Sequence, residues 1–74
     1  MLISVKCYAT LRGYQPKGGD LEMDEGLSVK SLLQSLGLPL EEVKVVFVNG
    51  RHASLEQELR HGDKVAAFPA VGGG

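Results

Sequence analysis

The opening segment of the chain alternates apolar and polar side chains, which is the period of a strand with one buried face. The apolar set is Ile3, Val5, Cys7 and Ala9, and the opposite set is Ser4, Lys6 and Tyr8. Residues 11–19 are rich in glycine and contain a proline, so they predict a loop. Leu21 and Met23 then alternate with acidic residues, which predicts a short second strand paired with the first.

Residues 29–36 carry the pattern of an amphipathic helix. The apolar residues Val29, Leu32, Leu33 and Leu36 follow one another at positions i, i+3, i+4 and i+7. Ser28 is a good N-cap because its hydroxyl can accept a free backbone N–H of the first turn. Gly37 is suited to the left-handed residue after a helix, and Pro39 prevents the helix from resuming.

The second half of the chain predicts three more extended segments. Residues 44–49 are rich in β-branched and aromatic side chains, which favours a strand. Asn49-Gly50 is a strong hairpin signal, and residues 51–54 are expected to return as a brief strand. Residues 64–68 predict the last strand, and Pro69 ends its pairing because proline has no N–H.

Between these strands, Leu55 and Leu59 lie four residues apart and predict a single helical or 3₁₀ turn over residues 55–60. His61-Gly62-Asp63 predicts a tight turn. The order of elements therefore predicts an α+β roll, in which one main helix covers a mixed sheet of four to five strands. We expect the first and last strands to lie parallel at the centre of this sheet. Residues 1–69 form one domain in this interpretation, and residues 70–74 form a flexible, glycine-rich tail.

Composition narrows the class of protein. Of the 74 residues, 43% are hydrophobic and 23% are charged, which is the balance of a folded globular domain. Eight basic residues face nine acidic ones without a basic cluster, which argues against nucleic-acid binding. No apolar run is long enough to span a membrane, and the first residues lack the features of a signal peptide. We therefore expect a cytoplasmic protein.

Side chains within the predicted domain offer little for catalysis. His52 and His61 fall in predicted turns, where a solvated histidine is expected. Cys7 falls on the apolar side of the first strand and is expected to be a buried small hydrophobe. It is the only cysteine, which excludes an internal disulfide. The acidic residues of the loops have no histidine or cysteine close in sequence, so no metal site is predicted.

The tail Gly72-Gly73-Gly74 has two interpretations. In the first interpretation it is a frayed terminus or a linker remnant, since glycine runs are flexible. Alternatively, it carries a functional carboxylate at Gly74, because glycines without Cβ pass through a channel too narrow for side chains. Five extended residues reach roughly 17 Å, far enough to enter a partner's active site.

The run Val45-Val46-Phe47-Val48 does not alternate, so this strand is apolar on both faces. One helix covers only one face, which leaves part of the run exposed unless loops cover it. Exposed apolar patches on small proteins often mark partner surfaces. The predicted partner surface comprises Val45, Phe47, Phe68 and Pro69.

The chain resembles the MoaD/ThiS family of ubiquitin-like β-grasp sulfur carriers over essentially its whole length. The resemblance begins at Tyr8-Ala9-Thr10-Leu11-Arg12 and continues through Val48-Asn49-Gly50. It is strongest over residues 59–74, where a Gly62-Asp63 turn precedes a hydrophobic strand ending in Phe68-Pro69, a short spacer and the terminal glycines. Ala70 stands where many molybdopterin-type members have a second proline, and Gly72 replaces another small residue.

This resemblance implies a β-grasp fold and a carrier that is not itself an enzyme. Gly74 would be adenylated by an ATP-dependent, ubiquitin-activating-type adenylyltransferase and converted to a thiocarboxylate, with Gly73 and Gly72 giving it passage. No cofactor would be bound, since the ATP is used by the partner. The sulfur acceptor would be a synthase resembling the molybdopterin synthase large subunit or thiazole synthase.

Phe68-Pro69 and Ala9-Thr10-Leu11-Arg12 look more like the molybdopterin or tungstopterin branch than the thiamine branch. Two alternatives use the same residues differently. The chain could be a ubiquitin-like modifier conjugated through Gly74, or a β-grasp binding module whose glycines are incidental.

Overall fold

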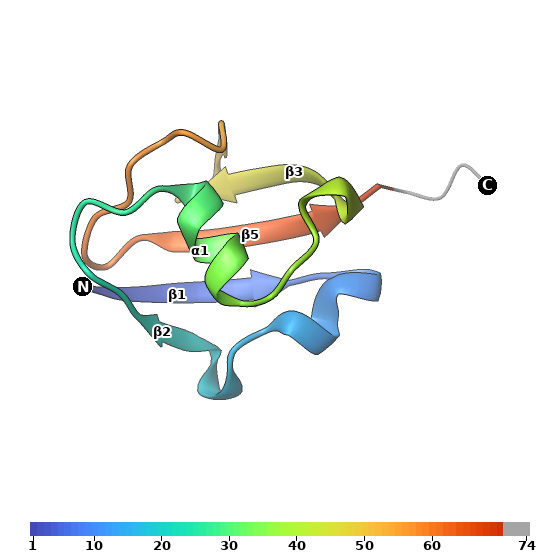
Figure 1. Cartoon of the computed structure of the whole chain (residues 1–74), viewed down its shortest axis with the longest axis horizontal. Coiled ribbons are helices and arrows are strands. Elements are labelled where there is room, and N and C mark those ends of the chain that lie inside the picture. The colour runs from blue at the N-terminus through green and yellow to red at the C-terminus, as the bar shows by residue number, and fades with distance from the viewer. Residues whose placement is uncertain (71–74) are drawn as a thin grey trace.

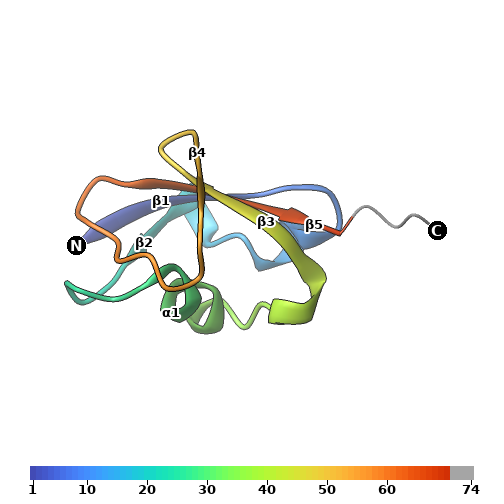
Figure 2. The same cartoon turned by 90° about the horizontal axis from the view of Figure 1, so that it is seen from above.

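The computed structural model describes residues 1–70 and shows one main helix on one face of a five-stranded mixed sheet (Figures 1 and 2). The strands are β1 (Leu2–Cys7), β2 (Asp20–Glu22), β3 (Val43–Val48), β4 (Arg51–Ala53) and β5 (Lys64–Pro69), and the helix is α1 (Val29–Ser35). Three short 3₁₀ helices complete the described chain: η1 (Ala9–Tyr14), η2 (Lys17–Gly19) and η3 (Leu40–Glu42). The predicted α+β roll is confirmed.

The strands lie in the order β2-β1-β5-β3-β4. β1 and β5 are parallel, with a register that runs from Ser4 opposite Lys64 to Cys7 opposite Ala67. The other neighbouring pairs are antiparallel. The first and last strands therefore occupy the centre as predicted, and the three-residue strands β2 and β4 form the two edges.

The core lies between α1 and the inner face of the sheet. Alternate residues of β1, β3 and β5 point into it and meet the apolar side of the helix. These buried residues include Ile3, Val5, Cys7, Val46, Val48, Val65, Ala67, Val29, Leu32 and Leu33. The predicted helix ends are confirmed, because the Ser31 N–H donates to the Ser28 hydroxyl at 3.2 Å and Gly37 has a φ of 74°. Within residues 1–70, no helix is long and apolar enough to cross a membrane.

Ala9 was predicted on the buried side of the first strand, and this prediction is wrong. The strand ends at Cys7, and Ala9 is exposed with a φ of 52°. The backbone turns there because the Leu11 N–H donates to the Tyr8 carbonyl at 2.9 Å. Leu11 then takes a core position and is fully buried. Most of the predicted loop over residues 11–19 is folded into η1 and η2.

The helical turn predicted over residues 55–60 is also absent from the structure. The segment forms a hydrogen-bonded turn and then runs beside the start of α1. Its carbonyls at Leu55 and Gln57 accept the N–H groups of Lys30 and Val29, each at 2.9 Å. These N–H groups belong to the first turn of the helix and have no partner within it. The segment is therefore held in place by capping another element instead of forming a helix of its own.

Candidate functional site

The tail root is the point at which the chain leaves β5. Pro69 pairs with Val43, and the N–H of Ala70 donates to the Glu42 carbonyl at 3.3 Å. Figure 1 shows this root at one end of the elongated molecule, beyond the C-terminal end of β5. The predicted tail residues Gly72, Gly73 and Gly74 lie outside the described residues. The described fold thus anchors the backbone up to the residue before Val71.

Three aromatic side chains form a cluster on the outer sheet face, the face opposite α1. Phe68 of β5 stacks on Tyr8, with ring centroids 4.4 Å apart and planes 7° from parallel. It also forms a T-shaped pair with Phe47 of β3, with ring centroids 5.7 Å apart and planes at 90°. Aromatic pairs of this kind contribute about 0.5–1.5 kcal/mol each beyond the burial of their area. This aromatic cluster fixes the orientation of the Phe68 ring directly before the tail root.

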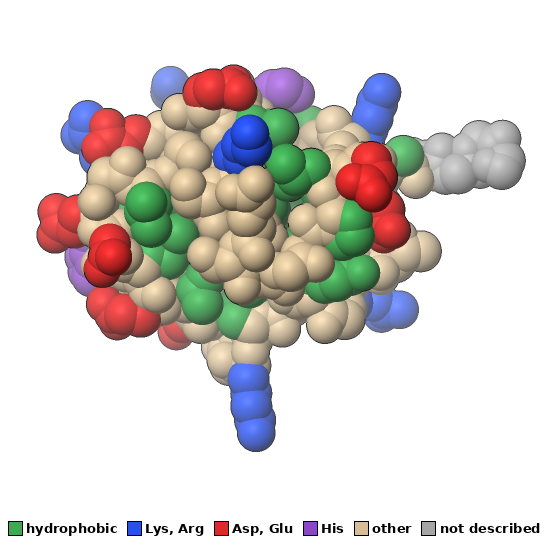
Figure 3. All heavy atoms as spheres, in the orientation of Figure 1, with side chains coloured by type: hydrophobic (Ala, Val, Ile, Leu, Met, Phe, Trp, Pro, Cys, Tyr) green, Lys and Arg blue, Asp and Glu red, His purple; other side chains and the backbone are tan. Residues whose placement is uncertain are grey.

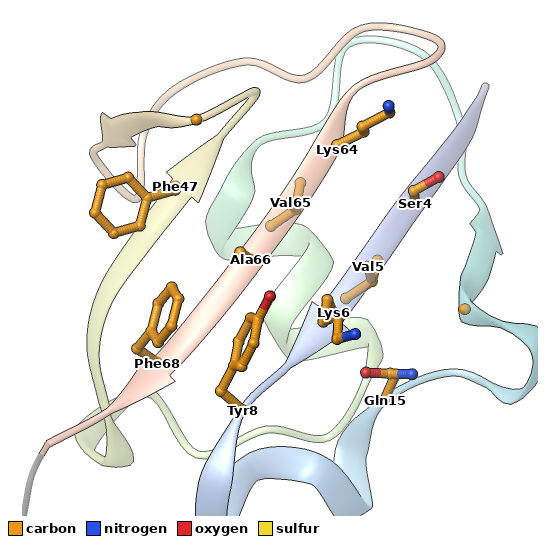
Figure 4. A pocket seen from close by; sticks show the side chains of 12 residues that line it. Ser4, Val5, Lys6, Tyr8, Gln15, Phe47, Lys64, Val65, Ala66 and Phe68 are labelled. Carbon is orange, nitrogen blue, oxygen red and sulfur yellow. The ribbon is translucent and has the colours of Figure 1, made fainter.

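A groove of about 590 Å³ runs along the same face, over β1 and β5 (Figure 4). Residues that line it include Ser4, Lys6, Tyr8, Phe47, Lys64 and Phe68, with Ala66 between them. Figure 4 places Ser4 and Lys64 toward the end away from the tail root, and Tyr8 and Phe68 toward the tail root. We refer to this feature as the outer-face groove.

Two of the predicted partner-surface residues, Phe47 and Phe68, line the outer-face groove, and Val45 lies beside Phe68. Val45 and Phe47 alternate with the buried Val46 and Val48, so β3 is indeed apolar on both faces. Val45 pairs with Phe68, and both remain half-buried rather than covered. Pro69 is half-buried at the end of β5. The structure thus brings Val45, Phe47 and Phe68 together, while their role in binding a partner stays a prediction.

Sequence reasoning missed three members of this face: Tyr8, Lys6 and Lys64. The alternation of residues placed Tyr8 and Lys6 on the outer side of the first strand, but this side was interpreted only as the polar face of the strand. The parallel pairing of β1 with β5 aligns that side with Phe68 and Lys64. The signal was available in the expected central pairing, which joins the outer residues of the first and last strands.

The other candidate side chains are exposed or buried as expected, but His52 lies in strand β4 and not in a turn. His52 and His61 are exposed. The ring of His52 meets the edge of Phe47 at 5.9 Å, and Nδ1 of His61 accepts the Leu2 N–H at 3.0 Å. Cys7 is only 1% exposed, and burial raises the pKa of its thiol. The neutral thiol is thereby favoured, which disfavours nucleophilic chemistry at this residue.

The charged side chains do not assemble an internal reaction centre. Acidic and basic groups are interspersed over the face that carries α1 (Figure 3). No group of three or more His, Cys, Asp or Glu residues within 1–70 could hold a metal ion. What the described residues provide is therefore a groove beside an anchored tail root.

Comparisons with known proteins agree with this geometry. The sequence profile of the ThiS family matches residues 5–74. A search of curated proteins found no match. Among solved structures, SAMP1 from Haloferax volcanii superposes with a TM-score of 0.75 at 24% identity over 100% of both chains.

Two further structures show the same architecture. The putative molybdopterin converting factor, subunit 1, from Pyrococcus furiosus has a TM-score of 0.74 and 27% identity, covering 96% of this chain and 99% of that one. Urm1 from Trypanosoma brucei has a TM-score of 0.65 and 19% identity, covering 99% and 95%. The fold is therefore a ubiquitin-like β-grasp. Because the family profile spans nearly the whole sequence, this chain belongs to the ThiS family, whose MoaD-like members are small carrier proteins and not catalysts themselves.

Proposed function

We propose that this protein is a sulfur carrier that works through the carboxylate of Gly74. The observation that carries the proposal is the ThiS family match, which continues through Gly72-Gly73-Gly74. The fold supports it, because β5 ends at Pro69 and the next residue, Ala70, is exposed at one end of the molecule. A carrier of this kind needs no catalytic side chain of its own.

The chemistry requires an activating enzyme, since a carboxylate is a poor electrophile. A Gly74 oxygen would attack the α-phosphorus of ATP, forming the acyl adenylate and releasing pyrophosphate. A donor persulfide would then attack the acyl carbon and release AMP, giving an acyl disulfide. A second thiol would cleave its S–S bond, freeing the thiocarboxylate and leaving a disulfide on the donor. One carboxylate oxygen leaves with AMP, and one sulfur replaces it.

The residues of this chain would bind and position rather than react. Gly73 and Gly72 would give the extended tail passage into the partner's active site. Val45, Phe47, Phe68 and Pro69 would contribute to the partner surface. Holding the carboxylate at the partner's reaction centre raises its effective concentration, which is the carrier's contribution to the rate.

Two classes of partner follow from this proposal. One is an ATP-dependent, ubiquitin-activating-type adenylyltransferase, and the other is a sulfur-accepting synthase. The similarity to the molybdopterin converting factor subunit favours an acceptor resembling the molybdopterin synthase large subunit over one resembling thiazole synthase. Both partners would be encountered in the cytoplasm.

The test is an intact-mass measurement after incubation with the activating enzyme of the same organism, ATP and a persulfide source. We expect a gain of about 16 Da, because one oxygen is replaced by sulfur. Deletion of Gly73 and Gly74 should abolish the gain. An unchanged mass, with the enzyme shown to be active on another carrier, would contradict the proposal. Higher-mass conjugates on a denaturing gel would instead indicate a protein modifier.

A further inference from the structure

The regular pairing of β3 with β5 is interrupted just before the tail root. Val45 lies opposite Phe68, and the next pair joins Val43 to Pro69. Two steps along β3 thus correspond to one step along β5, and Lys44 is the extra residue of a β-bulge. A bulge bends its strand and increases the local twist, which changes the direction of the paired chains. This bend falls where β5 ends and the tail begins.

The backbone stays paired for one residue beyond β5. The Ala70 N–H donates to the Glu42 carbonyl at 3.3 Å, so the first residue of the tail still follows η3. Figures 1 and 2 both show η3 beside the end of β5 from which the tail leaves. We refer to the bulge at Lys44 and the hydrogen bond between Ala70 and Glu42 together as the exit clamp.

The η3 side of the exit clamp is held in place by the rest of the fold. The Glu42 N–H donates to the Pro39 carbonyl at 3.0 Å, and the Val43 N–H donates to the Leu40 carbonyl. Leu40 and Val43 are half-buried and pack against the core. Packing therefore fixes the backbone of η3 and, with it, the direction of the Glu42 carbonyl.

Lys44 contributes its backbone, and not its side chain, to the exit clamp. Residues two apart in a regular strand face the same side of the sheet. Here Val45 lies on the outer face with Phe68, whereas Val43 packs against the core, because one extra residue separates them. The Lys44 side chain is exposed, and no ion pair within residues 1–70 involves it.

We propose that the exit clamp aims the tail, and that Lys44 and Ala70 are positioning residues for the reaction of the Gly74 carboxylate. This inference rests on the proposed sulfur-carrier function. Four residues follow Ala70, so the carboxylate lies at most about 14 Å from the clamp. Over so short a span, a change of direction at the clamp moves the carboxylate away from a partner's reaction centre. A misplacement of about 1 Å can lower a rate by about 100-fold.

The test measures kcat and KM for thiocarboxylate formation with the full-length protein. Deletion of Lys44 removes the bulge, while the pairs on either side of it can still form in an unbroken ladder. We expect kcat to fall about tenfold or more with little change in KM, because the carboxylate is misplaced and docking is retained. Lys44→Ala keeps the extra residue and removes only the side chain, so it should retain the wild-type kcat. Amide NMR spectra establish that each variant is folded.

A second variant leaves the sheet untouched. One glycine inserted between Ala70 and Val71 lengthens the tail beyond the exit clamp without changing any described residue. We expect kcat to fall about fivefold or more, because the clamp no longer sets the span to the carboxylate. A glycine inserted between Gly18 and Gly19, in the η2 turn, is the control and should leave kcat unchanged.

The outcomes separate the two proposals. An active wild type with an unchanged kcat for the folded Lys44 deletion or for the tail insertion would overturn the exit clamp and leave the carrier function standing. Equal losses for the Lys44 deletion and Lys44→Ala, or a raised KM alone, would also overturn it, since a side chain or a docking surface would then be responsible.

An inactive wild type would instead contradict the carrier function. The exit clamp is then tested without a partner, by hydrogen exchange of the Ala70 amide followed by NMR. We expect this amide to exchange about tenfold more slowly than in an unstructured chain, because it is hydrogen-bonded to Glu42. Exchange at the unstructured rate would overturn the clamp.

Discussion

The side-chain amide of Asn49 donates a 2.9 Å hydrogen bond to the carboxylate of Asp63, joining two turns that are far apart in the sequence. The Asn49 oxygen accepts the Lys64 N–H, and the second Asp63 oxygen accepts the Arg60 N–H, each at 2.9 Å. Asn49 also has a left-handed φ of 53°, which asparagine tolerates better than most residues. The Asn49-Gly50 and Gly62-Asp63 motifs are thus halves of one structural unit that positions the start of β5.

Replacing Asn49 by alanine should destabilise the fold. The change removes both side-chain hydrogen bonds and leaves a left-handed backbone occupied by alanine. We expect a loss of about 1–3 kcal/mol in the free energy of unfolding. Urea denaturation followed by circular dichroism measures it. Gln34→Ala, at an exposed position of α1, is the matched control and should stay within about 0.5 kcal/mol of wild type. Equal stabilities would contradict the role of Asn49.

Tyr8→Ala should affect partner activation more than stability. It removes the ring stacked on Phe68 but leaves the buried core intact. We expect a stability loss of about 0.5–1.5 kcal/mol and an increase in KM for thiocarboxylation of about tenfold. Tyr8→Phe preserves the stacked ring and should restore both values, which shows that the ring and not the hydroxyl matters. If Tyr8→Ala is activated as efficiently as wild type, the aromatic cluster is not part of the partner surface.

The buried thiol of Cys7 should make stability fall at alkaline pH. Burial raises the pKa of this thiol in the folded state, so the unfolded chain releases the proton more readily. The contribution is fully present below the unfolded thiol's pKa, about 8.5, and is lost as pH rises toward the folded-state value. The free energy of unfolding of wild type should therefore decline relative to Cys7→Ala above about pH 8.5.

The same burial predicts slow chemical modification. Iodoacetamide at neutral pH should label Cys7 only when the protein unfolds, as followed by intact mass in native buffer and in urea. Rapid labelling of the folded protein, or a parallel pH dependence for wild type and Cys7→Ala, would argue against this account.

Gly73→Val should block activation without changing the fold. A β-branched side chain directly before Gly74 would obstruct a channel that admits only glycine. We expect a loss on the order of 100-fold in kcat/KM, because small displacements of a reacting group are costly. The mass gain after incubation with enzyme, ATP and persulfide is the readout, and Ala70→Ser is the control. Full activation of Gly73→Val would show that the tail does not enter a narrow channel.

Local rules predicted the parts of the fold that depend on local interactions. The helix over residues 29–36 follows from its apolar spacing, and its ends follow from Ser28 and Gly37. The prediction of a helical turn over residues 55–60 was wrong because the carbonyls of Leu55 and Gln57 cap α1. The spacing of residues within the segment does not reveal this contact between elements. The prediction that Ala9 is buried was wrong for a similar reason, since the chain turns after β1 and Leu11 takes the core position instead.

The residues of the candidate site also fall into a group that the sequence predicted and a group that depends on strand pairing. Apolar runs identified Val45, Phe47 and Phe68, because a strand that carries apolar side chains on both faces can be recognised from the sequence. The surroundings of Ala66 in the outer-face groove were not predicted, since they depend on the register that places Lys6 and Phe47 on either side of this alanine. A shift of one residue in either pairing would place a different side chain beside Ala66.

The central position of β5 also determines how the protein responds to force. The strand that leads to the tail is hydrogen-bonded to β1 on one side and to β3 on the other (Figure 1). A pull on the tail acts along this strand and loads both ladders in shear, so their bonds share the tension instead of opening one after another. A partner that pulls on the chain while it draws in or releases the carrier would therefore have to break both ladders together before the sheet unravels.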